Sequence, residues 1–289
     1  MISVTGARAE GTTMKFLASV CVALACFLGT AHADDVAADG GAGAAADRID
    51  IDSDNFIEGS LYFVVYHELG HAMVSEFQLP VVGREEDAVD GLATKLLTPD
   101  DDEPTPDYLM GAIKSWFLFG SLTKVNDIAW WDEHGTENQR AYRIACLLYG
   151  SNPAKFKDVA DTVKLPDDRR GGCERDSKQN EESWDTLMDD DTYGAEDKVP
   201  ADAATPEIVY QPTDKFQEQQ DYLKKLGLFD DIAKFMHDNY KFKPGIKLIA
   251  NECGQVNAFW NPGDRTLTVC YEIVQAYQNL AKQIDSTSE

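Results

Sequence analysis

The spacing of apolar residues between positions 56 and 98 predicts two consecutive helices joined by a short turn. An apolar run covers residues 61–66, and the helical pattern continues to residue 77 before Pro80 and Gly83 interrupt it. A turn this short folds the second helix back against the first. That second helix is predicted from the apolar positions Val89, Leu92, Ala93, Leu96 and Leu97.

Helical spacing recurs in five later stretches of the chain. Thr136 precedes one of them and is a suitable N-cap, because its hydroxyl can accept a hydrogen bond from a free backbone N–H of the first turn. Most of the chain is therefore predicted to be helical. The five stretches are residues 109–125, 137–149, 152–163, 212–239 and 271–284.

The hydrophobic period changes near the C-terminus. Residues 246–249 and 266–269 alternate between apolar and polar positions, and residues 261–264 form a turn signal after the apolar residues 258–260. This pattern predicts a β-hairpin or two neighbouring strands. The fold class is therefore α+β and mainly α, with a small C-terminal β-hairpin or sheet.

Two stretches show neither period. Residues 34–54 are rich in Ala, Gly and Asp, which predicts a disordered segment. Residues 169–205 are polar and acidic, which predicts a long loop or linker. Residues 55–289 are then expected to form one domain, or two lobes joined by the acidic stretch.

The N-terminus reads as a secretory signal in residues 1–33, with Met14 as an alternative start. Lys15 precedes an apolar core at residues 16–28, which is too short to span a bilayer, and Ala31-His32-Ala33 forms a small-x-small cleavage site. We expect a secreted or periplasmic product without a stable membrane anchor after cleavage.

The chain is strongly acidic. It holds 26 Lys and Arg residues against 51 Asp and Glu residues, a formal net charge of −25. Such a charge repels nucleic acids and anionic membranes, so we expect no nucleic-acid partner.

Four of the six cysteines lie after the signal segment: Cys146, Cys173, Cys253 and Cys270. An even number in an exported protein suggests two disulfides. Of the three possible pairings, Cys146–Cys173 and Cys253–Cys270 are favoured because both close short loops. The alternative, a thiolate metal site, lacks the usual CxxC spacing.

The main chemical signal is the motif His67-Glu68-Leu69-Gly70-His71. Residues four positions apart share one face of a helix, so both imidazoles can reach one metal ion. Glu68 lies beside that face and can hold a metal-bound water without ligating the metal. The motif therefore predicts a zinc site suited to hydrolysis, although a pair of core histidines is the structural alternative.

The second predicted helix can complete this site. Two histidines leave room for a third protein ligand, and a carboxylate commonly supplies it. Glu86 is the candidate, and Asp90 lies four positions later, where it can accept the second ring N–H of a ligating histidine. Glu85 and Asp87 flank Glu86 and are alternative ligands. Simple complementation of the helix dipole would also explain their acidity.

The Glu-xxx-Asp pattern after an HExxH helix resembles the gluzincin metallopeptidases. The string HELGHAMVSEFQLPVVGREEDAVDGLAT is similar to a family of predicted, mostly bacterial zinc metallopeptidases catalogued as a domain of unknown function. Looser resemblance continues through the segments around residues 132–140, 146–150, 253–259 and 270–272. The resemblance implies a zincin-like metal helix pair and a zinc peptidase.

The gluzincin resemblance also implies a distal His or Tyr that stabilises the oxyanion. His134 is the candidate, since the aromatic residues Trp130 and Trp131 before it could wall a cleft. Alternatively, His134 only solvates a turn. The tyrosines Tyr142, Tyr149 and Tyr271 are equally suitable donors.

The expected function is an exported zinc-dependent metallopeptidase. Zn²⁺ would be held by His67, His71 and Glu86, Glu68 would act as the general base, and a peptide or protein would be the substrate. The first alternative is a pseudo-peptidase that binds metal and a peptide or protein partner without turnover. The second is a zinc hydrolase of a non-peptide amide, such as a cell-wall component. The oligomeric state is left open.

Overall fold

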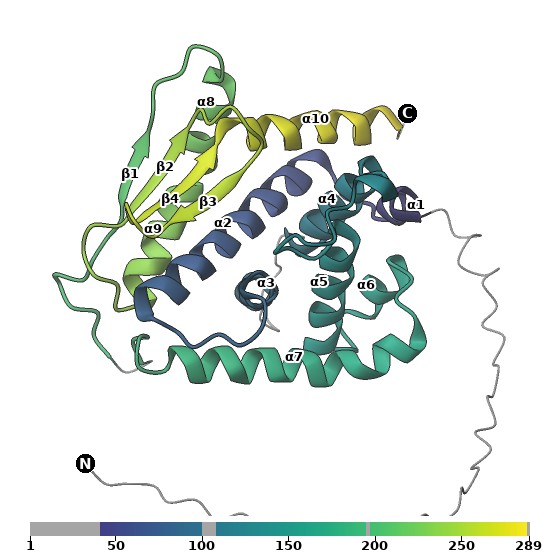
Figure 1. Ribbon diagram of the computed structural model, residues 1–289, viewed down its shortest axis with the longest axis horizontal. Helices are drawn as coiled ribbons and strands as arrows, with labels where there is room; N and C mark the ends of the chain where they lie inside the picture. Colours follow the sequence, from purple (N-terminus) through teal and green to yellow (C-terminus); the bar gives the residue numbers. More distant parts are fainter. Residues whose placement is uncertain (1–40, 100–107, 195–196, 288–289) are drawn as a thin grey trace, which may run out of the picture. The chain divides into compact units, whose positions relative to one another are not determined.

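The computed structural model describes residues 41–99, 108–194 and 197–287 (Figure 1). The predicted signal segment and the first residues of the predicted disordered segment lie outside this range, as does the whole of the unit Met1–Ala38. The residues from Asp39 to Glu289 form one compact unit. Its secondary structure is mainly helical with a small four-stranded sheet, which confirms the predicted fold class.

Helix α2 (Ser53–Phe77) is the central element of this unit. It begins at Asp52, whose carboxylate accepts a hydrogen bond from the backbone N–H of Asn55 at 2.9 Å. Most of its side chains from Phe56 to Met73 are buried, because α2 packs against α3, α4 and α10 and against strand β3. A helix that is apolar on nearly all sides is expected at the centre of a fold.

The other helices of the N-terminal part pack around α2 and one another. Helix α4 lies against α2, α5 packs on α4, and α7 packs on α5 (Figure 1). Thr136 caps α5, as predicted, with a reciprocal hydrogen-bonded capping box to Gln139. The elements are α1 (Gly41–Asp47), α3 (Glu85–Leu97), α4 (Tyr108–Leu122), a 3₁₀ turn (Val125–Asp127), α5 (Glu137–Ser151), α6 (Lys157–Thr162) and α7 (Asp167–Met188).

Two of these helices correct the sequence predictions. Residues 41–47 form α1 inside the segment predicted to be disordered, and Ala45, Ala46 and Ile49 are buried there against the protein core. Most of the predicted acidic linker is α7, whose narrow buried stripe includes Cys173 and Trp184. The side chains of α1 are too small, and those of α7 too polar, to show a hydrophobic period. Their helical structure depends instead on packing against neighbouring elements.

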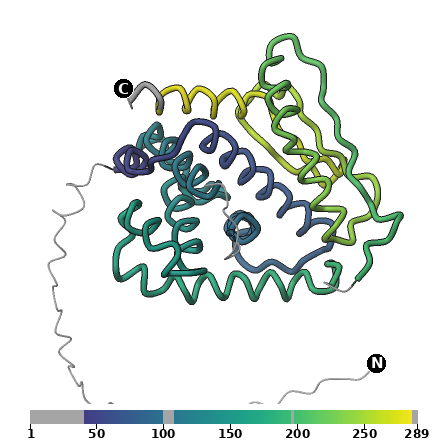
Figure 2. Tube along the Cα trace, turned by 180° about the vertical axis from the view of Figure 1, so that it is seen from behind, coloured from purple at the N-terminus to yellow at the C-terminus, as the bar shows by residue number. Residues whose placement is uncertain are grey.

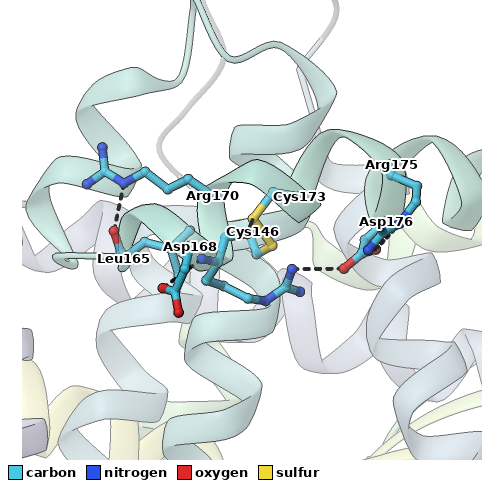
Figure 3. The surroundings of a disulfide bond; sticks show 8 residues. Cys146, Leu165, Asp168, Arg170, Cys173, Arg175 and Asp176 are labelled. Carbon is cyan, nitrogen blue, oxygen red and sulfur yellow. Dashed lines mark hydrogen bonds and ion pairs between the residues drawn. A yellow bond between two sulfur atoms is a disulfide. The ribbon is translucent and has the colours of Figure 1, made fainter. Parts of the chain in front are cut away.

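A disulfide between Cys146 and Cys173 joins α5 to α7 (Figure 3). The two helices approach so closely beside it that a β-carbon placed on Gly150 would lie 2.1 Å from the carbonyl oxygen of Cys173. The second disulfide joins Cys253 to Cys270 at the end of strand β4. These are the two pairs that the sequence favours.

The sheet has the strand order β1-β2-β4-β3. Strands β1 (Glu207–Tyr210), β2 (Lys247–Asn251) and β4 (Thr266–Cys270) are parallel, while β3 (Ala258–Asn261) pairs antiparallel with β4. The predicted strand segments therefore include a true hairpin, β3–β4. Strand β1 was not predicted, because it is short and is held by pairing with β2, which lies far along the sequence.

Three helices accompany the sheet: α8 (Gln217–Leu226), α9 (Leu228–Asn239) and α10 (Tyr271–Thr287). Helices α8 and α9 lie against one face of the sheet in both views (Figures 1 and 2). Helix α10 leaves the end of β4 directly and packs on α2. Among the residues described, no helix has the length and apolar character that crossing a membrane requires.

The packing of α3 against α2 depends on Gly70 inside the histidine motif. A β-carbon on Gly70 would lie 2.8 Å from Cβ of Val89, a fully buried side chain of α3. We predict that Gly70→Ala lowers the free energy of unfolding by about 1–3 kcal/mol, because the extra methyl group overpacks this contact. Urea denaturation followed by circular dichroism measures the change.

The control is Gly171→Ala in α7, an exposed helical glycine at which an added β-carbon meets no heavy atom within 4 Å. This substitution should leave stability unchanged or raise it by about 0.5–1 kcal/mol. Equal stability of the two variants would contradict the tight α2–α3 contact.

Candidate metal centre

His67 and His71 project from the same face of α2. They lie one helical turn apart, and their ring centroids are separated by 4.9 Å. His67 is only 2% exposed, whereas His71 is partly open to solvent. The Nε2 atoms of both rings point toward the first turn of α3.

Glu86 in the first turn of α3 meets both histidines. Its Oε2 atom lies 3.1 Å from Nε2 of His67 and 3.3 Å from Nε2 of His71. These separations suit a tetrahedral metal ion, whose ligands at about 2.0–2.1 Å lie roughly 3.3 Å from one another. The three ligand atoms all lie within 4.8 Å of one another, so this group could hold a metal ion.

The Nδ1 atoms of both histidines are also engaged by carboxylates. Nδ1 of His67 lies 2.8 Å from Oδ1 of Asp90, the partner expected from the sequence. Nδ1 of His71 lies 2.7 Å from Oε1 of Glu85, so Glu85 orients a histidine from outside the three-atom group. A proton on each Nδ1 leaves each Nε2 with a lone pair for a metal. The alternative ligand Asp87 is not a member of the group.

Arg140 of α5 is a participant to which sequence reasoning assigned no role. Its Nε and Nη2 atoms donate hydrogen bonds to Oδ2 and Oδ1 of Asp90 at 2.8 and 2.6 Å, and its guanidinium lies 3.7 Å from the centre of the Trp116 ring. Both charged groups are buried. The only sequence signal was the family resemblance around residues 132–140, since nothing local relates Arg140 to a helix 50 residues earlier.

Glu68 contacts the sheet and lines the same cavity as the two histidines and Glu86. Its carboxylate is 7% exposed, and Oε2 accepts a hydrogen bond from the backbone N–H of Trp260 in β3 at 2.8 Å. Burial raises the pKa of Glu68, although the two histidines and this N–H oppose the rise. A carboxyl group with a raised pKa beside a metal site is suited to taking up and releasing a proton.

His134 reaches the site from the connection between α4 and α5. Its Nε2 lies 2.9 Å from Oε2 of Glu86, and its Nδ1 lies 2.9 Å from Oδ1 of Asp132. It is not a member of the mutually close ligand group. Within the described chain, the wall of the adjoining cavity includes His134 but none of the alternative donors Tyr142, Tyr149 and Tyr271.

The charges of this cluster shift the pKa values of its members. Burial opposes the charged forms of His67 and His71, but their hydrogen bonds to carboxylates outweigh it, raising the pKa of His71 to about 9 and that of His67 above its ordinary value. The three histidines hold the pKa of Glu86 far below its usual range, against the effect of its burial. These pKa shifts apply to the protein without a bound metal ion. A cation bound at this group would keep His67 and His71 neutral.

A cavity of about 1100 Å³ opens beside the cluster. His67, His71, Glu86 and Glu68 contribute to its wall, together with side chains of α4, α10 and β3. A small molecule or a peptide segment therefore has access to the face of the site where a metal would bind. This openness distinguishes the site from a closed structural metal site.

A second group, Cys253, Cys270 and Glu272, also has metal-ligand spacing. Its two cysteines are joined in a disulfide, so their sulfur atoms are not thiolate ligands. The Glu272 carboxylate accepts hydrogen bonds from the backbone N–H groups of Cys253 and Gly254 at 3.2 and 2.6 Å. This group ties the start of α10 to the loop before β3.

One protein-family model matches residues 32–188 and 210–289, and its description is "Putative metallopeptidase". The matched ranges include both histidines, Glu68, Glu86 and His134. Neither the curated proteins nor the solved structures include a match.

The Asp90–Arg140 pair generates a prediction about stability. Removing one partner of a buried ion pair leaves an uncompensated charge, so Asp90→Ala should lower the free energy of unfolding by about 3–5 kcal/mol. Asp87→Ala removes the same charge from a half-buried position of the same helix and should change it by about 0.5 kcal/mol or less. Urea denaturation without added metal measures both values.

The double variant Asp90→Leu/Arg140→Met removes both charges and should regain much of the loss. An Asp90→Ala protein that is as stable as Asp87→Ala would show that this ion pair does not hold α3 to α5.

Proposed function

The chain belongs to the DUF4344 family, described as "Putative metallopeptidase", and from this premise we propose that it is an exported zinc-dependent metallopeptidase that hydrolyses peptide bonds. The observation that carries the proposal is the convergence of Nε2 of His67, Nε2 of His71 and Oε2 of Glu86 beside an open cavity. In this proposal these three residues are the metal ligands.

The donor set favours zinc. Two imidazoles and one carboxylate are typical of catalytic zinc sites, whereas structural zinc sites are usually richer in cysteine. A bound zinc ion would polarise the scissile carbonyl group and lower the pKa of a coordinated water to about 7.

In this proposal Glu68 is the general base. It lies on the same helix as the histidines but does not join their ligand group, and it borders the cavity. We assign it the removal of a proton from the attacking water and the delivery of that proton to the leaving amine. The Trp260 N–H fixes one carboxylate oxygen, which leaves the other free for the water.

His134 is the proposed stabiliser of the oxyanion. Both ring nitrogens face carboxylates, Nε2 that of Glu86 and Nδ1 that of Asp132, and these carboxylates raise the pKa of His134. The raised pKa favours the imidazolium form, in which Nε2 also carries a proton that it can donate. A donor at this place could hydrogen-bond the oxygen that becomes negative during attack. The proposed metal ligands and the proposed general base do not depend on this role of His134.

Strand β3 supports a peptide as the substrate. It is one of the two edge strands of the sheet, and Ala258 and Trp260 line the same cavity as the proposed ligands. A peptide could add to such an edge through its own backbone hydrogen bonds. Export is supported by the two disulfides, which are typical of oxidising compartments, together with the signal pattern in the sequence.

We predict that the purified protein binds about one zinc ion per chain, as three protein ligands require. Glu86→Ala removes a ligand, whereas Glu85→Ala removes only the outer partner of His71. The Glu85 variant should lose about 10–100-fold in zinc affinity, and the Glu86 variant should lose more. Elemental mass spectrometry and competition with a chromophoric chelator measure these values.

Failure to take up zinc would refute the proposed site. A larger loss for Glu85→Ala than for Glu86→Ala would instead make Glu85 the third ligand.

The role of Glu68 predicts a separation of binding from turnover. Glu68→Gln should retain the zinc ion and lose at least about 100-fold in kcat, because the amide cannot take up the proton. Glu58→Gln, on the same helix and away from the cavity wall, should retain full activity. A quenched fluorescent peptide library provides the assay, and peptidoglycan fragments tested in parallel separate peptide from cell-wall amides.

Full activity of Glu68→Gln would refute this mechanism. A zinc-loaded wild-type protein that cleaves neither kind of substrate would favour a binding protein without turnover.

A further inference from the structure

An aromatic cluster forms the part of the cavity wall that α4 and α10 contribute. The ring centroids of Trp116 and Phe119 lie 6.2 Å apart, and those of Phe119 and Tyr277 lie 5.9 Å apart. All three rings line the cavity, and Ile273 lies beside them in the first turns of α10. The rings offer a bulky side chain large apolar contact areas, and the charge of Arg140, which stacks on Trp116 and also lines the cavity, is paired with Asp90.

The aromatic wall begins close to the proposed general base. Val64 also lines the cavity, and it precedes Glu68 by one turn of α2, a rise of about 6 Å. Trp116 is tied to the metal centre through Arg140, which stacks on its ring and pairs with Asp90. A substrate side chain next to the bond under attack would therefore fall within reach of this wall.

Other parts of the cavity wall are also apolar. Phe259 and Trp260 of β3 line the cavity, as do the exposed residues Leu122, at the end of α4, and Val256, before β3. Leu122 is 67% exposed and Val256 is 55% exposed, values that are high for large apolar side chains. Apolar surface left open at the mouth of a cavity indicates a binding role.

The charged residues of the wall exclude one class of ligand. Glu85, Glu133 and Glu137 line the cavity together with two arginines, the exposed Arg84 and the buried Arg140, whose charge is already engaged in an ion pair. An acidic side chain would meet like charges there and would lose its hydration without gaining a partner. A volume of about 1100 Å³ leaves room for a bulky side chain together with the peptide backbone.

We infer that the cavity selects peptides with a bulky apolar side chain, aromatic or branched aliphatic, beside the bond that is cut. Phe119 and Trp116 are the specificity-determining residues, with Leu122 contributing at the end of α4. The inference rests on the proposed peptidase function and adds the class of substrate to it.

The test uses zinc-loaded Glu68→Gln protein, whose zinc content is measured first. The probes are N-acetyl amino-acid hydroxamates that carry an Ala, Leu, Phe or Glu side chain. The hydroxamate group anchors each probe on the zinc ion, so differences in Kd report contacts of the side chain alone. Isothermal titration calorimetry should show the Leu and Phe probes binding about tenfold or more tightly than the Ala probe, and the Glu probe binding most weakly.

Phe119→Ala, introduced into the same background, should reduce the preference for Phe over Ala to about threefold or less by removing one side of the wall. Leu122→Ala changes an exposed residue that folding does not require and should reduce the preference partially. Val125→Ala removes an exposed apolar side chain that does not line this cavity, so it should keep the full preference.

Equal Kd values for the four probes on zinc-loaded protein would overturn the substrate class while leaving the metal site in place. Tightest binding of the Glu probe would overturn the substrate class as well. Protein without zinc would overturn the proposed function itself, and the zinc measurement distinguishes that outcome before any probe is added.

Discussion

The buried ion pair between Asp90 and Arg140 links the helices around the candidate metal centre. Asp90 belongs to α3, Arg140 belongs to α5, and the same carboxylate meets Nδ1 of His67 on α2. Burying either charge alone would cost free energy, so each buried charge requires the other beside it. Burial opposes the ionisation of Asp90, but the positive charge of Arg140 and the hydrogen bond from His67 hold its pKa well below the usual range. The helices cannot shift relative to one another without breaking this arrangement.

The second constraint comes from the sheet. Glu68 lies where α2 meets β3, and its carboxylate accepts a hydrogen bond from the backbone N–H of Trp260. Strand β3 is held by its antiparallel pairing with β4. The Cys253–Cys270 disulfide also joins the loop before β3 to the end of β4. The proposed base and the proposed ligands therefore share one helix but are oriented by different parts of the fold. That division allows a metal site and a proton acceptor to be positioned independently.

The acidic residues at the start of α3 serve more than one purpose. Arg84 at the N-cap makes no side-chain hydrogen bond to the helix, so Glu85, Glu86 and Asp87 complement the positive end of the helix dipole. Two of them also meet histidines of α2. The same acidic residues can therefore stabilise the helix and contact the histidines. The acidity of this turn alone does not show which residue faces the histidine Nε2 atoms, whereas the distances to the histidine nitrogens do.

The features that arise from short-range periodicity could be predicted before the structure was known. The sequence predicted the metal helix pair, the placement of two histidines on one face, the capped helix after Thr136 and the C-terminal hairpin. Local spacing is sufficient for these because it records which face of an element is buried. It failed for α1 and α7, whose polar or small side chains carry no strong period, and for β1, which depends on a distant strand.

The contacts between residues from different elements became evident only from the packing of the helices and strands. Glu85 and Glu86 are neighbours in sequence, and the rotation of α3 against α2 brings Glu86 to both Nε2 atoms while Glu85 reaches only Nδ1 of His71. Arg140 and the Trp260 N–H joined the site from positions far along the chain. Such contacts follow from how helices and strands pack in space. The periodicity of a single segment cannot encode that packing.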